Sequence, residues 1–330
     1  MCVAILEVLD STIMNVALTH MMPALSANRE EITWVLTSYI VASAIMIPLT
    51  GFLTRILGQR KLLLINTTGF MIASLLCGLT SSLKMMVFLR CVQGAFGAAL
   101  IPLSQSILKQ SFPLEKQGKA MAIWGMGVLV APVLGPTIGG IITDNASWRW
   151  VFYINPPICL VALVLAVLFI PKTKGQSSPI DWFGIGLIFL GIGALQLFLD
   201  QGNMNDWFSS NYILCIAIIS FIAIVLLIIR SLTTPEPAIQ LRLFNNRNFR
   251  LAVMCLTLFC GIQFSLLTLE PIMLLQLFGY TSTLAGLTLM PMGVCSAMSV
   301  ALCSNLLNRV KIKYVIMAGC CLSMTGIHYL

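Results

Sequence analysis

The sequence has few charged residues and few histidines. Of its 330 residues only 9% are charged and two are histidine, whereas a soluble globular domain has about 25% charged residues. Nineteen basic and eleven acidic side chains are too few to give a chain of this length a polar shell in water. The composition therefore excludes a soluble enzyme, a nucleic-acid-binding protein and a disordered tail.

Motifs for metal binding or catalysis are also missing. Although the chain has eleven cysteines, it has no CxxC and no Cys/His ligand spacing, and the neighbours Cys320 and Cys321 would point about 100° apart on a helix. His20 and His328 lie in no HExxH motif, and no GxSxG occurs. We therefore interpret the cysteines as small packing residues, expect no metal and no cofactor, and reject an intramembrane enzyme as the weakest alternative.

Long apolar runs fill the sequence instead, since 58% of the residues are hydrophobic. A transmembrane helix needs about 20 apolar residues to cross roughly 30 Å of hydrocarbon, and eleven runs meet this requirement. The expected spans are residues 2–22, 33–53, 62–80, 86–108, 120–142, 151–170, 182–199, 212–230, 249–271, 283–306 and 313–330. The sequence thus predicts an all-α integral membrane protein.

The positions of the basic residues predict how the chain is oriented. Fifteen lysines and arginines lie in or beside the loops after the even-numbered spans, and three lie in the loops on the other side. Cytoplasmic loops carry the excess of basic residues, so we expect the N-terminus on the cytoplasmic side and Leu330 on the outer face. Apolar sequence reaches nearly to Met1 and to Leu330, so we expect the complete protein to be longer.

A charged side chain in hydrocarbon costs about 2.5–3.5 kcal/mol or more, so Glu7, Asp10, Arg90 and Glu270 need an explanation. Glu7 and Asp10 are three residues apart and share one helical face, and Arg90 is the candidate partner for both. Burial favours a neutral carboxyl and a nearby guanidinium favours the carboxylate, so such a cluster can take up and release a proton. A static ion pair that fixes helix register is the alternative. Glu270, directly before Pro271, fits a solvated loop-capping role as well as a buried one.

The span at residues 120–142 is rich in glycine and proline. Small residues at 131, 135 and 139 recur every four residues on one face, and this spacing permits close helix contact. Pro132 and Pro136 each remove a backbone donor and predict a bend. We expect a kinked, closely packed helix.

Four segments resemble signatures of the major facilitator superfamily, and the match reaches its fourteen-helix drug:proton antiporters of the EmrB/QacA type. They are residues 9–18 (LDSTIMNVAL), 51–61 (GFLTRILGQRK), 90–94 (RCVQG) and 131–140 (APVLGPTIGG). The sequence departs from the family pattern at Thr19, where proline is usual, and at Arg55, which occupies an acidic position.

The resemblance implies roles for particular residues. Asp10, Glu7 and Arg90 would couple transport to protons. The remaining residues that it singles out are Gly127, Pro132, Gly135, Pro136, Gly139 and Gly140 for packing of the antiporter helix, and Gly51, Gly58, Arg60 and Lys61 for a cytoplasmic loop motif.

Further segments at 148–156, 180–184 and 206–209 resemble the fourteen-helix branch. By that map, residues 1–171 form an N-terminal six-helix half, and residues 172–247 hold an inserted helix pair. Residues 248–330 then hold the first three helices of a second half. The chain would contain about eleven of fourteen helices.

Proton-driven efflux of lipophilic or amphipathic drugs by alternating access across a bacterial inner membrane is the implied function. The implied partners are the lipid bilayer, protons, a drug-like substrate and, as in Gram-negative permeases of this type, a periplasmic adaptor protein and an outer-membrane channel. No residue of the sequence itself specifies the last two. A non-transporting remnant and a transporter or symporter of another small molecule are the alternatives.

Aromatic and methionine side chains suggest where a lipophilic substrate would bind. The candidates for a substrate cavity are Trp34, Tyr39, Gln93, Trp124 and Met126. Aromatic residues at helix ends also serve as interfacial anchors, and those in mid-span as core residues.

Overall fold

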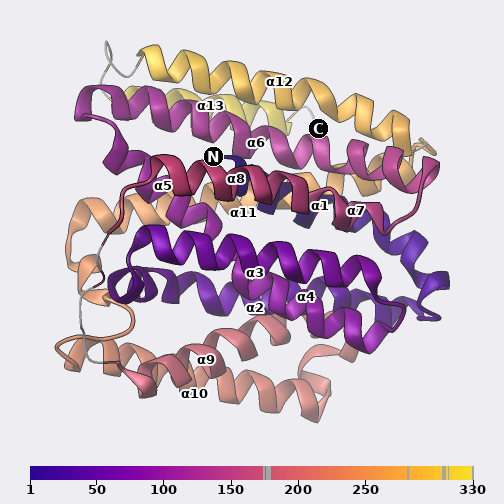
Figure 1. The fold of residues 1–330 in the computed structure, drawn as a ribbon, viewed down its shortest axis with the longest axis horizontal. Helices are drawn as coiled ribbons and strands as arrows, with labels where there is room; N and C mark the ends of the chain where they lie inside the picture. The colour runs from indigo at the N-terminus through magenta and orange to yellow at the C-terminus, as the bar shows by residue number, and fades with distance from the viewer. Residues whose placement is uncertain (174, 176–179, 281, 307–309, 311, 329–330) are drawn as a thin grey trace.

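α-Helices occupy every predicted span in the computed structural model, which describes residues 1–173, 175, 180–280, 282–306, 310 and 312–328 (Figure 1). The helices are α1 (Cys2–Ala24), α2 (Arg29–Leu57), α3 (Gln59–Leu79), α4 (Leu83–Gly97), α5 (Leu100–Ser111), α6 (Leu114–Asn145), α7 (Trp150–Tyr153), α8 (Asn155–Phe169), α9 (Trp182–Gln201), α10 (Asn211–Thr233), α11 (Arg247–Gln276), α12 (Ser282–Leu306) and α13 (Ile312–His328). Short 3-10 helices lie in the connections, at η1 (Asn203–Asn205), η2 (Trp207–Ser209) and η3 (Leu241–Asn245).

Most of these helices have the length and apolarity of membrane spans. Within the described residues, eight segments qualify when α4 and α5 count as one span and α7 and α8 as another, and α6 adds a ninth if its two bent parts form one span. Large apolar side chains such as Phe169, Phe221 and Leu168 are strongly exposed on the bundle surface. Such a surface suits hydrocarbon, which supports the prediction of an all-α membrane protein.

Three predicted spans are broken or bent. The span at 86–108 divides into α4 and α5 at Ala98, and the span at 151–170 divides into α7 and α8 just before Pro156. The two parts of α6 meet at 44° near Pro132. Proline lacks the N–H that a helix needs and its ring clashes with the preceding turn, so the bend predicted for this segment is observed.

Local sequence signals set several helix ends. Asn28 and Glu31 form a reciprocal capping box at the start of α2, with the Asn28 Oδ1 accepting from the Glu31 N–H at 2.8 Å. Asp181 caps α9 by accepting from the Gly184 N–H at 3.0 Å. Gly58 joins α2 to α3 with a φ of +80°, a conformation that favours glycine.

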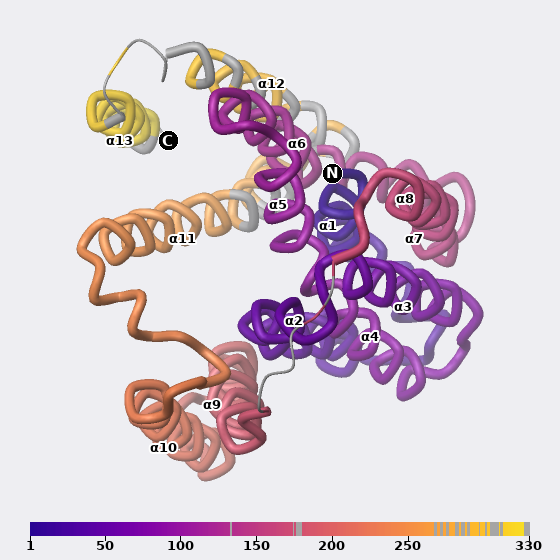
Figure 2. The backbone as a smooth tube through the Cα atoms, turned by 60° about the vertical axis from the view of Figure 1, so that its left-hand side comes forward, coloured from indigo at the N-terminus to yellow at the C-terminus, as the bar shows by residue number. Residues whose placement is uncertain are grey.

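The helices lie roughly side by side, and α1 occupies the centre of the N-terminal bundle (Figures 1 and 2). It packs mainly on α6, while α2 and α3 pack on α4, and α8 packs on α3. The α9–α10 pair lies against α2 through a core that includes Ile45, Leu49, Ile188 and Leu227. On the far side of the bundle, α12 packs on α6. The predicted division at residues 171 and 247 stays a prediction.

Candidate functional site

A buried ion pair lies between α1 and α4. Arg90 Nη1 is 2.8 Å from Asp10 Oδ2, and both side chains are fully buried. Isolated charges in hydrocarbon are costly, and breaking a buried pair by removing one partner costs about 3–5 kcal/mol. The pairing that the sequence predicts between Asp10 and Arg90 is confirmed.

Two amide side chains complete the hydrogen bonding of Asp10. Its Oδ1 accepts from Asn155 Nδ2 at 2.5 Å and from Gln93 Nε2 at 3.2 Å. Gln93 also accepts from Arg90 Nη1 at 2.8 Å, and Asn155 Nδ2 donates to Ser74 Oγ at 2.9 Å. The Asp10 carboxylate therefore receives hydrogen bonds from three buried side chains, contributed by α4 and α8.

The guanidinium of Arg90 is held from several sides. Its Nε donates to the Val35 carbonyl at 3.3 Å, and its carbon lies 4.2 Å from the centre of the Tyr39 ring and 5.9 Å from that of Phe152. Arg90 Nη2 is buried and has no hydrogen-bond partner in the described part of the chain. The fork of donors and the flat π surface fix this side chain more firmly than a lysine could be fixed.

Glu7 is not a partner of Arg90 in this structure, which corrects the prediction that one arginine serves both carboxylates. Glu7 Oε1 accepts from the Tyr39 hydroxyl at 3.4 Å, and the Tyr39 ring in turn covers Arg90. Glu7 precedes Asp10 by almost one helical turn, and its hydrogen-bond partner Tyr39 belongs to α2. The hydrogen bonding of Glu7 is linked to the ion pair through Tyr39.

The predicted glycine face of α6 lies directly against α1. A Cβ atom at Gly135 would stand 2.0 Å from Thr12 Oγ1, and one at Gly127 would stand 2.6 Å from Ile5 Cδ1. At Gly139 the nearest atom would be 3.1 Å away, on Ile13, whereas a Cβ at Gly140 would meet nothing within 4 Å. Three of these glycines thus face α1 at close range, and Gly140 does not.

The predicted loop motif lies where α2 meets α3. Arg60 Nη2 donates to the Val167 carbonyl at 2.7 Å, and a Cβ at Gly58 would stand 2.4 Å from the Thr173 carbonyl. Lys61 is exposed. These contacts tie the start of α3 to the end of α8 and the chain that follows it.

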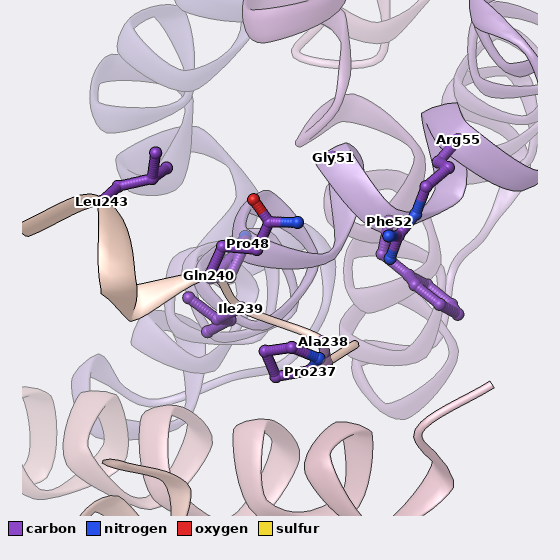
Figure 3. A pocket seen from close by; sticks show the side chains of 9 residues that line it. All are labelled: Pro48, Gly51, Phe52, Arg55, Pro237, Ala238, Ile239, Gln240 and Leu243. Atoms are coloured by element: carbon purple, nitrogen blue, oxygen red, sulfur yellow. The ribbon is translucent and has the colours of Figure 1, made fainter. Parts of the chain in front are cut away.

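Arg55, the departure from the family pattern in this motif, forms an ion pair with Glu236 at 3.8 Å. It also lines a cavity of about 300 Å³ between the end of α2 and residues 237–243, together with Pro48, Gly51, Phe52 and Gln240 (Figure 3). Since both side chains of the pair are partly exposed, water screens their attraction.

The five residues predicted to line a substrate cavity have different surroundings in the described part of the chain. Tyr39 and Gln93 belong to the ion-pair site, while Trp34 lines a separate hollow with Glu31 and Lys84 at the start of α2. Five residues of helix separate Trp34 from Tyr39, so the two side chains point about 140° apart.

The other two members of that set lie on α6. Trp124 Nε1 donates to Ser104 Oγ at 3.0 Å and binds α6 to α5. Met126 lines an apolar hollow of about 370 Å³ between α1 and α6, with Ile5, Leu9 and Val130. The prediction that these five residues line a substrate cavity stays a prediction.

Some site residues were missed from the sequence. Asn155 binds Asp10, and Ser74 binds Asn155; their signal was a buried amide and a hydroxyl inside apolar runs. Asp200 lies one residue beyond the predicted span at 182–199. In the structure it belongs to α9, and its carboxylate accepts from the buried Thr37 hydroxyl of α2. Glu270 is half-buried in α11.

The sequence-family model of the Major Facilitator Superfamily matches residues 1–330, so the chain belongs to this superfamily. The chain is 43% identical to the multidrug export protein EmrB of Escherichia coli strain K12, over 88% of this chain and 57% of that protein. It is 39% identical to the fatty acid resistance protein FarB of Neisseria gonorrhoeae, over 95% of this chain and 62% of that protein. The chain therefore spans less than two thirds of the length of these relatives.

Solved structures show a similar fold. The xylose transporter XylE from E. coli, in a partially occluded inward-open conformation, superposes with a TM-score of 0.55 over 93% of this chain and 71% of that one. The two sequences are 14% identical, so the likeness concerns the fold alone.

Proposed function

Because the chain belongs to the major facilitator superfamily and is an EmrB-type member of it, we propose that it serves proton-coupled export of lipophilic or amphipathic compounds. The observation that carries the proposal is the buried Asp10–Arg90 pair, in which a single carboxylate is held between α1, α4 and α8. A titratable carboxylate on one helix that bonds to two others can link its proton occupancy to how those three helices pack.

The proposed cycle uses this link. A proton from the outside neutralises Asp10, which weakens its attraction to Arg90 and favours the packing that faces the cytoplasm. Release of the proton inward restores the pair, and the substrate leaves outward when the two halves rock around the central site. Proton binding at Asp10 and substrate export are thus coupled, because both depend on the same equilibrium between inward-facing and outward-facing packing.

The substrate class rests on the relatives and on the hollow beside Met126. The relatives are named for multidrug export and fatty acid resistance, and an apolar surface with flexible methionines accepts varied lipophilic shapes. An adaptor protein in the periplasm and an outer-membrane channel belong to this proposal, as does placement in the inner membrane with a cytoplasmic N-terminus, which the excess of basic residues in alternate loops supports.

Export from inverted membrane vesicles tests the function. Asp10→Asn keeps the size of the side chain and removes its charge, and we expect it to reduce dye accumulation driven by a pH gradient at least tenfold. Asp144→Asn is the matched control, since this carboxylate is exposed near the end of α6, and it should export as the wild type does. Equal export by Asp10→Asn and the wild type would refute proton coupling at Asp10.

A further inference from the structure

The hydrogen bonds around Asp10 raise a question about its protonated form. All three groups that bond to the carboxylate, from Arg90, Gln93 and Asn155, are donors. A protonated carboxyl group has an O–H of its own and needs an acceptor. A buried O–H without an acceptor is unfavourable, so the site must offer one if Asp10 is to take up a proton there.

Only one of the three neighbours has a free acceptor. A guanidinium has none. The Gln93 carbonyl already accepts from Arg90 Nη1 at 2.8 Å and lies 3.8 Å from the Cys77 thiol. Asn155 Oδ1 is fully buried and has no partner within the described part of the chain.

We infer that Asn155 is a positioning residue whose amide turns over when Asp10 is protonated, presenting Oδ1 to the carboxyl O–H in place of Nδ2. The inference rests on the proposed proton coupling. The oxygen and nitrogen of an amide occupy nearly the same volume, and the terminal torsion of asparagine is two-fold, so the turn needs no repacking. Asn155 thereby stabilises both protonation states of Asp10.

Ser74 suits both orientations of the amide. Its hydroxyl now accepts from Asn155 Nδ2 at 2.9 Å and donates to the Phe152 carbonyl at 2.9 Å. After the turn, the same hydroxyl can rotate and donate to Asn155 Oδ1, because a hydroxyl is both donor and acceptor. The proton balance is simple: one proton binds Asp10 and no covalent bond other than its O–H forms.

Other titratable groups face this site and act together with it. They are Arg90 from α4, Glu7 beside Asp10 on α1, Tyr39 from α2, Cys77 from α3 and Cys159 from α8. None of them hydrogen-bonds to Asn155 Oδ1. Substitution of Asn155 therefore changes the hydrogen bonding of Asp10 without removing a hydrogen bond to any of these other groups.

Infrared difference spectroscopy of the purified protein, titrated between alkaline and acid pH, tests the inference. The C=O band of protonated Asp10 is the one that Asp10→Asn removes. We expect Asn155→Leu, which has neither donor nor acceptor, to shift this band to higher frequency, and Asn155→Ser, which has both, to return it toward the wild-type position. Asn66→Leu is the matched control, because this buried amide bonds to its own helix at the Leu62 carbonyl.

The outcomes separate the inference from the proposed function. A band for Asp10 that is the same in Asn155→Leu and in the wild type would overturn the inference and leave proton coupling intact. If the folded wild type shows no Asp10 band at any pH, proton binding at Asp10 and the inference both fail. Should Asn155→Leu not fold, Asn155→Ala, which also lacks the donor and the acceptor, takes its place: an Asp10 band at higher frequency than in the wild type supports the inference, and a band at the wild-type position opposes it.

Discussion

At the residue scale, the ion pair depends on the shape of Arg90 and not only on its charge. The guanidinium bonds to Asp10, Gln93 and the Val35 carbonyl while it stacks on Tyr39. We expect Arg90→Lys to reduce export at least tenfold, because one ammonium cannot span these partners. Initial export rates in vesicles with matched protein levels check this, and wild-type rates in Arg90→Lys would show that charge alone suffices.

Tyr39 makes two contacts, a hydrogen bond to Glu7 and a stacking contact with Arg90, and two substitutions can separate them. Tyr39→Phe keeps the ring over Arg90 and loses the hydrogen bond to Glu7, so it should cost about 0.5–1.5 kcal/mol of stability at most. Tyr39→Leu loses both contacts and should cost more, by about 0.5–2 kcal/mol for the cation–π contact alone. Thermal unfolding in detergent compares them, and equal losses would remove the stacking contact from the account.

At the scale of elements, the contact between α1 and α6 is close enough for a single methyl group to disturb it. A Cβ at Gly135 would overlap Thr12 Oγ1, which is itself held by bonds to the Val8 and Leu9 carbonyls. Gly135→Ala should therefore destabilise the protein by about 1–3 kcal/mol. Gly140→Ala, which has open space around its Cβ, should be neutral or stabilising by up to about 1 kcal/mol. Equal melting temperatures for the two variants would contradict this packing.

An ion pair between Asp181, the residue before α9, and Arg230 of α10, here called the clip, should make the α9–α10 pair sensitive to acid. Burial by itself raises the pKa of Asp181, but hydrogen bonds from the Gly184 N–H and from Arg230, with the Arg230 charge, outweigh it and hold the pKa below its ordinary value. A lowered pKa means that the pair stabilises the fold above the ordinary pKa of aspartate and loses this effect as the pH falls through the folded value.

The clip is modest, at about 1 kcal/mol or less, because the Arg230 side chain is 40% exposed. Between about pH 5 and pH 2, the melting temperature of the wild type should fall more steeply than that of Asp181→Asn. Arg230→Gln should resemble Asp181→Asn in this comparison. Parallel slopes for all three proteins would show that the clip does not contribute.

The sequence predicted the elements better than it predicted their partners. Apolar runs locate all eleven helical regions because the length of a span is set by the bilayer, and Pro132 and Pro136 indicate the bend in α6 because proline acts locally. The role of Asn155 was not predictable, since an amide in an apolar run becomes meaningful only when α8 places it 2.5 Å from Asp10. Residue type does not specify which face a helix presents, so the surroundings of Trp34 beside Glu31 and Lys84 were not predictable either.

At the scale of the whole molecule, the basic residues predict a topology that can be checked from both sides of the membrane. A cysteine at Lys116, in the first turn of α6, should react with an impermeant thiol reagent only from the cytoplasmic side. A cysteine at Asn145, at the other end of α6, should react only from the outside. Both positions are exposed, so labelling from the reversed sides would invert the proposed orientation.

The central claim is that one proton site at Asp10 drives the movement of the whole bundle. Proton movement into liposomes that contain the purified protein and a pH-sensitive dye tests it most directly, when a lipophilic substrate is supplied on the opposite side. The account predicts substrate-dependent proton flux for the wild type and Asp144→Asn, and none above the empty-liposome level for Asp10→Asn. Substrate-dependent proton flux of equal size in Asp10→Asn would contradict it.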